Sequence, residues 1–451
     1  MMTNNKTNIS PEMIADSRLC VIGLGYVGLP LARLFATRYP VVGLDCNALR
    51  VNSINAGHDT TGEVEDELLQ SVLVSENAHQ AGLYCSSDIK EVKCLIDAAP
   101  RKRCVFIVAV PTPVDRNSHP DLAPLMDASR QVGHLISSGD VVVYESTVYP
   151  GVTEECCIPL VEEVSGLRYN VDFYAGYSPE RINPGDKSHR VESIVKVTSG
   201  STPEVADFVD ALYCSVLVNG THKAPSIKVA EASKIIENSQ RDVNIAFMNE
   251  LAKIFNAMGI DTHDVIEAAS SKWNFIKLSP GLVGGHCISV DPYYLIQKAQ
   301  VYGVLPRVMS NARRLNDGMG DYVANQVIKC MNKKGVMVKD AKILILGITF
   351  KENCPDIRNT KVVDIYNTLA EYTKNITIYD PWANPEQVKH EYGIDINCQL
   401  STVNCQLYDV CIAAVAHKEF EELDILGLLN EMHVIYDVKG MLDRKIVDGR
   451  L

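Results

Sequence analysis

The chain has 451 residues, which is enough for about three domains of ordinary size. Hydrophobic residues make up 46% and charged residues 22%, so the composition excludes a disordered chain. With 43 Lys and Arg against 56 Asp and Glu, the net charge is −13, which argues against nucleic acid or an anionic membrane surface as a partner. An anionic substrate would therefore need local basic side chains.

The fourteen cysteines are scattered, with no CxxC pair and no metal-binding spacing. Cys156 and Cys157 are adjacent, which suits neither a mutual disulfide nor a zinc site. The first residues lack the basic and apolar runs of a signal peptide, and no apolar run approaches the roughly 20 residues of a membrane helix. We expect a soluble cytoplasmic protein with reduced cysteines, no metal and no membrane segment.

The first third opens with a dinucleotide-binding pattern. A short strand at Arg18–Ile22 runs into the turn Gly23–Gly28, and an apolar helix follows at Leu29–Phe35. A second strand, Val41–Leu44, ends at Asp45. Strand, glycine turn, helix, strand and terminal acid within about 30 residues predict a βαβ unit that binds a dinucleotide.

The glycines and the charged residues of this unit can each be given a chemical role. Gly23, Gly25 and Gly28 let the backbone approach a pyrophosphate at a helix N-terminus. Asp45 would accept hydrogen bonds from the adenosine ribose, which favours NAD over NADP. Arg50 leaves two alternatives open: it accommodates a 2′-phosphate, or it is a solvated helix residue.

Two further strands end in turns that are typical of ligand-binding edges. Cys104–Val110 is followed by Pro111-Thr112-Pro113, and Val141–Tyr144 by Glu145-Ser146-Thr147. Ligands bind at the carboxyl ends of parallel strands, so these turns are candidate binding segments.

The middle of the chain predicts one long helix from Ser226 to Met258, without Gly or Pro. Glu231, Lys234, Asn238 and Arg241 follow one another at spacings of three and four, which puts them near one face. They form either a solvated stripe or, if the helix is buried between domains, an oxyanion site built from a lysine and an amide. A helix this long suggests a domain junction or a two-fold interface.

A Gly- and Pro-rich irregular segment is expected from Trp273 to Pro292, with helices at Asp264–Ser270 and Val308–Met331 on its two sides. In it, Gly284 and Gly285 precede His286 and Cys287, and Asp291 follows. A buried, inert thiol is the usual fate of a cysteine, but the paired glycines and the acid favour an accessible nucleophile. A thiol beside nicotinamide indicates thiohemiacetal and thioester chemistry. His286 is either a base or a substrate contact.

The last third returns to strands, at Lys342–Gly347, Ile376–Tyr379, Val410–Val415 and Val434–Asp437, and the second of these ends at Asp380. The fold class predicted is α/β, with two Rossmann-like doubly wound domains joined by a central helical domain that contains the long helix. The second copy lacks the full glycine signature and need not bind a dinucleotide. The predicted boundaries are residues 17–213, 214–330 and 331–451.

From Leu19 to Val447 the chain resembles the UDP-glucose/GDP-mannose dehydrogenase family. The motifs that carry the resemblance keep their order, and they are GLGYVGLP from Gly23, VPTP from Val110, ESTVYPG from Glu145, SPER from Ser178, the Lys234/Asn238 helix, GGHCISVDPYYL from Gly284 and GITFKENCPDIRNT from Gly347. Within the family, SPERINPGD and GLVGGHCISVDPYYL are most similar to members that oxidise UDP-N-acetylhexosamines.

The resemblance implies a four-electron oxidation of the sugar C6 alcohol to a carboxylate, with two NAD used in succession. Cys287 is then the nucleophile that carries the thiohemiacetal and the thioester. Lys234 and Asn238 stabilise the oxyanions, and Lys234 is a candidate base in the first oxidation. Asp291 orients the lysine and a water, and Thr147 lies near that water.

The resemblance also assigns binding residues. Glu180 assists thioester hydrolysis and contacts substrate, Arg358 reaches the NAD phosphates, and Lys351 lies near the nucleotide sugar. The other expected contacts are, for NAD, Tyr26, Val27, Pro111, Thr112, Ser146 and Thr147, and, for the substrate, Arg181, Lys234, Asn238, Arg241, Gly284 and His286.

The family further implies a homodimer through the central domain and a role in surface polysaccharide assembly, such as capsule or O-antigen. For the sugar, UDP-N-acetylglucosamine is preferred over its galacto and manno epimers and UDP-glucose. Two other classes stay open: a two-electron dehydrogenase of the hydroxyacid or 6-phosphogluconate type, and a non-catalytic nucleotide-sugar sensor. The number of NADH formed per substrate separates the first from the prediction.

Overall fold

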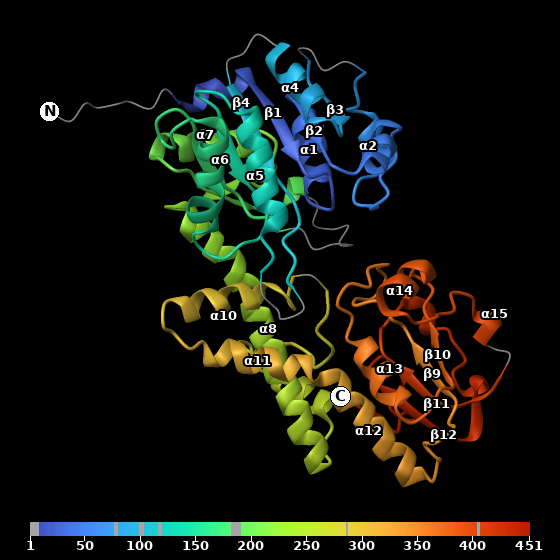
Figure 1. The fold of residues 1–451 in the computed structure, drawn as a ribbon. Helices are drawn as coiled ribbons and strands as arrows, with labels where there is room; N and C mark the ends of the chain where they lie inside the picture. The colour runs from blue at the N-terminus through green and yellow to red at the C-terminus, as the bar shows by residue number, and fades with distance from the viewer. Residues whose placement is uncertain are drawn as a thin grey trace. The chain divides into compact units, whose positions relative to one another are not determined.

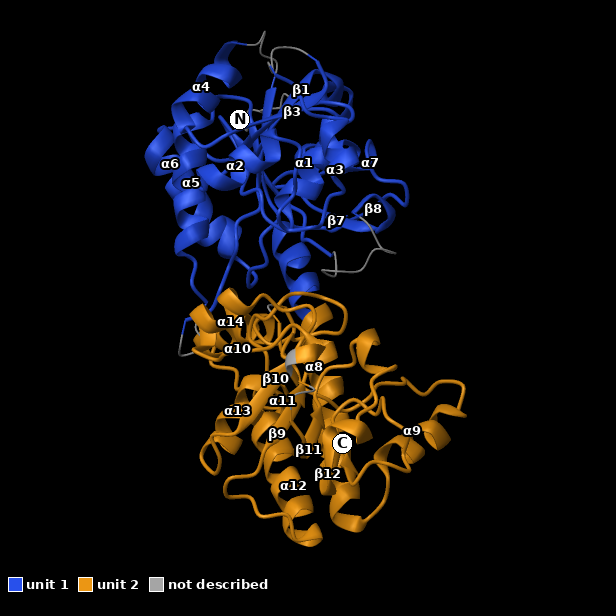
Figure 2. Cartoon of the chain, turned by 90° about the vertical axis from the view of Figure 1, so that its right-hand side faces the viewer, with its two compact units in different colours: residues 1–236 blue, residues 237–451 orange. Residues whose placement is uncertain are grey.

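The structure is a computed structural model that describes residues 9–75, 80–98, 103–115, 120–181, 191–285, 287–403 and 406–451 (Figure 1). It divides into two compact units, residues 1–236 and 237–451, shown in two colours in Figure 2. Each unit is described by itself.

The first unit contains a six-stranded parallel sheet in the order β3-β2-β1-β4-β5-β6. The order reverses between β1 and β4, which is the point where ligands bind in doubly wound sheets. The strands are β1 (Ser17–Ile22), β2 (Pro40–Leu44), β3 (Gly82–Ser86), β4 (Arg103–Val108), β5 (Val141–Tyr144) and β6 (Tyr174–Tyr177). A separate parallel pair is formed by β7 (Lys196–Thr198) and β8 (Thr221–Lys223).

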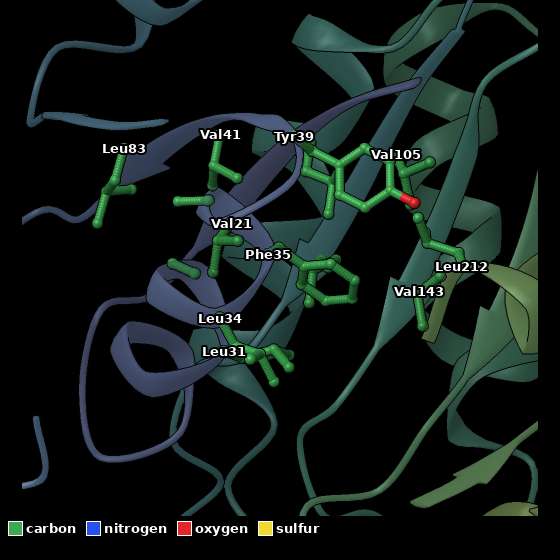
Figure 3. Packing of buried hydrophobic residues seen from close by; sticks show 14 of the residues in the cluster. Val21, Leu31, Leu34, Phe35, Tyr39, Val41, Leu83, Val105, Val143 and Leu212 are labelled. Atoms are coloured by element: carbon green, nitrogen blue, oxygen red, sulfur yellow. The ribbon is translucent and has the colours of Figure 1, made fainter. Parts of the chain in front are cut away.

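Helices cover both faces of this sheet, because alternate strand residues point to opposite sides and both sides are apolar. One face packs against α1 (Gly28–Ala36), α2 (Ala48–Asn55), α3 (Asp66–Gln70) and α7 (Pro203–Cys214). The other packs against α4 (Ile89–Ala98), α5 (Ala123–Leu135) and α6 (Ile158–Ser165). Figure 3 shows the first of these layers, where Phe35 of α1 and Leu212 of α7 meet Val21, Val105 and Val143 of the sheet.

The long helix α8 (Ile227–Met258) confirms the predicted helix from Ser226 to Met258 and continues from the first unit into the second. It is followed by α9 (Thr262–Ser270), α10 (Asp291–Val301), α11 (Arg307–Asp317) and α12 (Met319–Lys334).

Two details of the middle were predicted incorrectly. The single helix expected from Val308 to Met331 is two helices, because Gly318 ends α11 and α12 begins immediately after it. The irregular segment expected to reach Pro292 ends earlier, since Asp291 already begins α10. Proline is tolerated in the first turn of a helix, where its missing N–H has no partner to lose.

The second unit contains a five-stranded parallel sheet in the order β10-β9-β11-β12-β13. Its strands are β9 (Ile343–Leu346), β10 (Ile376–Tyr379), β11 (Tyr408–Ala413), β12 (Leu429–Asp437) and β13 (Gly449–Arg450). One face packs against α12, α13 (Val362–Ala370) and α14 (Pro385–Tyr392), and the other lies near α15 (Leu400–Val403). The predicted fold class, two Rossmann-like sheets with a helical segment between them in sequence, is confirmed.

Candidate active site

The glycine turn after β1 has the three properties that a dinucleotide site needs. Gly23 has φ +90°, and a Cβ there would lie 2.7 Å from the carbonyl oxygen of Ala109. A Cβ on Gly28 would lie 1.8 Å from the carbonyl oxygen of Gly23, so α1 packs directly against the turn. A Cβ on Gly25 would meet no described atom within 4 Å, so no packing inside the chain demands that glycine. The turn therefore fits a pyrophosphate at the N-terminus of α1.

Asp45 lies beside this turn at the end of β2. Its half-exposed carboxylate accepts backbone N–H bonds from Leu24 at 2.8 Å and from Asn47 at 2.9 Å. These bonds fix the carboxylate where a ribose hydroxyl can donate to it.

Arg50 is buried and paired, so the alternative of a solvated helix residue is wrong. Its guanidinium lies 2.6 Å from the Asp59 carboxylate and donates to the Leu24 carbonyl oxygen at 3.0 Å. Burial would raise the pKa of Asp59, but hydrogen bonds from Thr61, Val64 and Arg50 lower it below its ordinary value. Arg50 thus braces the glycine turn with its charge already matched.

The turns after β4 and β5 lie together, as expected from their strand ends. The Thr112 hydroxyl donates to the carbonyl oxygen of Thr147 at 2.8 Å, and the Ser146 hydroxyl donates to that of Val110 at 2.6 Å. Pro111 is exposed beside them. Of the remaining predicted NAD contacts, Tyr26 is exposed and Val27 half-buried in the turn before α1.

A buried acid–base cluster surrounds Glu180, and the sequence pattern did not reveal it. Lys196 Nζ lies 2.6 Å from one Glu145 oxygen and 3.5 Å from Glu180 Oε2, while the Tyr213 hydroxyl donates to the other Glu145 oxygen at 2.5 Å. Burial raises the pKa of Glu145 to about 7, against the lowering effect of Lys196. Lys196 begins the three-residue strand β7, and its place in the sequence gives no signal of a charge pair.

Arg181, next to Glu180, is half-buried and donates from its guanidinium to the carbonyl oxygen of Val195 at 2.9 Å.

On α8, three of the four aligned polar residues are buried and one is not. Glu231, Lys234 and Asn238 are buried, whereas Arg241 is exposed. The solvated-stripe alternative is therefore wrong for the first three. Glu231 accepts a backbone N–H from Gly151 at 2.5 Å, which anchors α8 to the loop before α6. Among the described residues, no hydrogen bond or ion pair engages the Lys234 ammonium.

The amide of Asn238 and the acid of Asp291 are in direct contact. Asn238 Nδ2 donates to Asp291 Oδ2 at 2.5 Å, and both side chains are buried. Asp291 begins α10, and its backbone N–H donates to the carbonyl oxygen of Cys287 at 2.9 Å. Cys287 is half-buried. Asp291 thus links the backbone of the candidate nucleophile to Asn238 on α8. His286 lies outside the described residues.

The paired glycines pack against the GITFKENCPDIRNT segment. A Cβ on Gly284 would lie 2.7 Å from the carbonyl oxygen of Asn359, and one on Gly285 would lie 2.8 Å from the Phe350 ring. The Arg358 carbonyl oxygen accepts the N–H of Gly285 at 3.0 Å. Two motifs more than 60 residues apart therefore form one surface.

This surface borders a pocket in the second unit. Its lining residues are Leu282, Gly284, Thr349, Phe350, Glu352, Thr360, Lys361, Val362, Ala414, Val415 and Lys439. Lys351 is half-buried, and the half-exposed Arg358 pairs with Asp356 at 2.5 Å. Sequence reasoning missed Lys361 and Lys439, although Lys439 follows the carboxyl end of β12, where ligands are expected.

In the described part of the chain, no three His, Cys, Asp or Glu side chains are grouped to hold a metal ion. No described helix is long and apolar enough to cross a membrane.

The fold and the site define a dinucleotide-dependent dehydrogenase, and comparison with known proteins gives its family. Residues 17–217 match the NAD binding domain of the UDP-glucose/GDP-mannose dehydrogenase family, residues 228–318 its central domain, and residues 344–444 its UDP binding domain. The chain belongs to this family. It is an NAD-dependent nucleotide-sugar dehydrogenase with a UDP-sugar as substrate, as predicted, and not a hydroxyacid-type enzyme.

Individual relatives are similar over nearly the whole chain. A UDP-N-acetyl-D-glucosamine 6-dehydrogenase of Pseudomonas aeruginosa is 52% identical over 97% of this chain and 100% of its own length. One of Salmonella typhi is 49% identical over 97% and 99%. The solved structure of a UDP-D-ManNAc dehydrogenase from Pyrococcus horikoshii superimposes with a TM-score of 0.83 at 29% identity, over 95% of this chain and 96% of that one.

Proposed function

We propose that the chain oxidises the C6 hydroxyl of UDP-N-acetyl-D-glucosamine to the carboxylate, with two NAD per sugar and Cys287 as nucleophile. The observation that carries the proposal is the 52% identity, over almost the entire chain, to a UDP-N-acetyl-D-glucosamine 6-dehydrogenase. UDP-N-acetylgalactosamine, UDP-N-acetylmannosamine and UDP-glucose are the alternative substrates.

When bound at the glycine turn after β1, NAD would supply the hydride acceptor for each of the two oxidations at C6. Before the first, the hydroxyl loses its proton, and Lys234, a buried lysine with no described partner, is suited to stabilise the alkoxide. The Cys287 sulfur then bonds to the C6 aldehyde as a thiohemiacetal. This covalent adduct can give up a second hydride and become a thioester, which water hydrolyses to the carboxylate and the free thiol.

In this scheme Asp291 orients the amide of Asn238, and Asn238 stabilises the oxyanion. One N–H of the Asn238 amide is committed to Asp291, which fixes the plane of the amide. The other N–H is then held ready to donate to the oxyanion that forms on C6. A donor that is already oriented costs no reorganisation in the transition state.

Residues of both units complete the assignment. We assign thioester hydrolysis to Glu180, with Thr147 near the attacking water. The substrate contacts Arg181, Arg241 and Gly284, together with the candidate His286, belong to the same proposal.

The UDP diphosphate is anionic and the chain carries a net charge of −13, so basic side chains must attract the substrate locally. Lys351 and the pocket residues Lys361 and Lys439 supply such charge in the second unit. We assign Arg358 to the phosphates of NAD.

Replacement of the nucleophile tests the proposal. Cys287→Ala should bind UDP-sugar and NAD but form no uronate, whereas the wild type should form two NADH per sugar. Cys94→Ala, which removes an exposed cysteine, is the matched control and should keep full activity. Full turnover by Cys287→Ala would overturn the nucleophile assignment. The same assay with the four UDP-sugars identifies the substrate.

We also propose a homodimer through the central helices. The second unit exposes large apolar side chains between residues 247 and 308, and Trp273 is 92% exposed. The others are Phe247, Ile254, Met258, Ile260, Ile276, Val301, Tyr302, Val304, Leu305 and Val308. So many exposed large apolar side chains in one stretch of the chain favour an interface, since contiguous apolar patches on soluble proteins usually mark interaction sites. Sedimentation should give a dimer, and Leu305→Asp with Val308→Asp should give monomers; a monomeric wild type would contradict the proposal.

The proposed location is the cytoplasm, and the proposed pathway is surface polysaccharide synthesis. None of the described cysteines is in a disulfide, which suits a reducing compartment in which Cys287 stays active.

A further inference from the structure

The stretch from Gly281 to Ile288 contains Cys287 and is called the Cys287 segment below. A side chain of α8 binds the backbone at its first residue. Asn249 Nδ2 donates to the carbonyl oxygen of Gly281 at 3.0 Å, and the N–H of Gly281 donates back to Asn249 Oδ1 at 2.8 Å. Asn249 is fully buried. Its amide therefore pairs with the backbone as a neighbouring strand would, and it fixes the point where the chain enters the segment.

The same segment is held directly after Cys287 by a buried arginine of α11. Arg313 donates to the carbonyl oxygen of Ile288 at 3.4 Å. Its guanidinium also pairs with Asp242 of α8 at 2.5 Å and with Asp317 at 2.5 Å. Only 1% of the Arg313 side chain is exposed, and Asp242 is fully buried.

Asn316 joins the two anchors into one network. Its amide nitrogen donates to Asp242 Oδ1 at 2.8 Å, and its amide oxygen accepts from Asn249 at 2.8 Å. The Tyr293 hydroxyl donates to Asp317 at 2.7 Å, which extends the network to α10. Buried polar side chains therefore connect α8 and α11 with both ends of the Cys287 segment, and the half-buried Tyr293 and Asp317 extend the connection to α10.

A buried network of this kind contributes little net free energy to folding, so we expect its main role to be the positioning of nearby catalytic groups. Desolvation of a buried ion pair offsets most of its Coulombic gain, and well-packed apolar residues of similar volume are often as stabilising. Catalysis, by contrast, is sensitive to misplacement of reacting groups by about 1 Å. Asp242 lies one helical turn beyond Asn238 on α8, so the network ties the Cys287 backbone to the helix that presents Asn238.

We propose that Asn249 and the Arg313–Asp242 pair are positioning residues for Cys287, and that they hold its thiol where it captures the C6 aldehyde. This inference rests on the proposed role of Cys287 as nucleophile. In the capture step the Sγ–C6 bond forms, the C=O π bond breaks, and the thiol proton ends on the new hydroxyl. If the thiol is misplaced, the first hydride transfer still occurs, but the aldehyde leaves the enzyme before the second.

The test uses the full-length enzyme with two changes at the network. Arg313→Met combined with Asp242→Asn removes both charges, so no unpaired charge stays buried, and the asparagine keeps an oxygen for Asn316. Arg313→Lys is the milder variant, since lysine keeps the charge but lacks the planar fork that reaches several acceptors. Arg314→Met is the matched control, because Arg314 is the exposed neighbour on the same helix.

Three sets of quantities are measured for each variant: the dissociation constants of UDP-sugar and NAD, the NADH and the uronate formed per sugar consumed, and the aldehyde trapped by methoxyamine. We expect both network variants to bind within about twofold of wild type and to lose uronate formation by about tenfold or more. The NADH yield should fall from two toward one per sugar consumed, with the balance of the sugar trapped as oxime. The control should behave as wild type.

Two outcomes would overturn the inference: an unchanged NADH yield without trapped aldehyde, or an equal loss of substrate binding and of both hydride transfers, as a purely structural role predicts. If the double variant does not fold, Arg313→Lys decides by the same readouts. Failure of the proposed function has a different signature, because Cys287→Ala would then form uronate.

Discussion

The two sheets of this protein begin with the same local device and use it differently. Gly23 after β1 and Gly347 after β9 have φ angles of +90° and +91°. In each sheet the neighbouring strand, β2 or β10, ends at an aspartate, Asp45 or Asp380. The repeated pattern of strand, glycine turn, strand and acid therefore forms the same backbone twice.

The surroundings of the two acids are opposite. Asp45 is half-exposed and accepts two backbone N–H groups. Asp380 is fully buried, and its carboxylate lies 3.2 Å from Nε2 of the buried His417. It also accepts the backbone N–H groups of Ile348, Thr349, Trp382 and Ala383.

This contrast teaches that the place of an acid at a strand end does not settle its role, because only the half-exposed Asp45 can be reached by a ligand such as the proposed ribose. Asp45 keeps acceptor capacity for a cofactor, while the capacity of Asp380 is used inside the chain. The family match agrees, since the first region is an NAD binding domain and the last a UDP binding domain.

The largest expected effect is a difference in the free energy of unfolding between alanine variants of the two acids. Asp380→Ala leaves four backbone N–H groups, three of them from buried residues, without this acceptor and removes the carboxylate beside His417, so the free energy of unfolding should fall by about 3–5 kcal/mol. Asp45→Ala should lower it by about 1 kcal/mol or less but raise the KM for NAD at least about tenfold. Urea denaturation and steady-state kinetics check both values, and equal destabilisation by the two changes would break the comparison.

Alanine at the two turns should produce similar strain with different functional results. Gly23→Ala and Gly347→Ala should each destabilise the protein by about 1–3 kcal/mol, since both have positive φ and little space for a Cβ. Only Gly23→Ala should weaken NAD binding, measured by titration calorimetry. Gly139→Ala is the control, because Gly139 has φ +89° but no described atom near its Cβ.

Removal of the Asp45 charge should change cofactor choice. Asp45→Asn keeps the shape of the side chain but no longer repels a 2′-phosphate. The ratio of kcat/KM for NAD over NADP should fall about tenfold, which corresponds to about 1.4 kcal/mol. An unchanged ratio would show that the ribose is recognised elsewhere.

The smallest expected effect is a change in the pH midpoint of acid unfolding, and it depends on Asp380. Burial would raise the pKa of Asp380, but the hydrogen bond and charge of His417 and the backbone N–H groups lower it below 3.8. Because the folded pKa lies below the unfolded one, this stabilisation is complete above pH 3.8 and is lost as the pH falls further. His417→Gln should therefore move the acid unfolding midpoint upward by about half a pH unit.

Trp382 stacks on His417 and reports this transition by its fluorescence, best in a Trp273→Phe background that leaves one tryptophan. His58→Gln is the matched control, since His58 pairs with Asp66 on the surface, where such a pair contributes little. A midpoint that moves equally in both variants would refute the explanation.

Much of the fold could be predicted because its signals are local. Apolar runs that end in glycine turns predicted the main strands, and the absence of Gly and Pro predicted α8. The predicted domain boundaries at residues 213 and 330 stay predictions. So do the catalytic and binding roles, although the structure places Asn238 against Asp291.

Residues whose role depends on a distant partner could not be predicted. Lys196 meets Glu145 across 51 residues of sequence, and Arg313 meets Asp242 across 71. No spacing rule connects such pairs, because the contact exists only after the strands and helices have packed.

The sequence by itself determined the elements, the two glycine turns, the NAD preference and the family, because each follows from short-range backbone chemistry and ordered motifs. Only the tertiary structure decided which acids can accept hydrogen bonds from a ligand and which have their acceptor capacity used by hydrogen bonds inside the chain. Asp45 and Asp380 look alike in sequence, and they differ because packing brings His417 and four backbone N–H groups to one carboxylate while the other stays half-exposed.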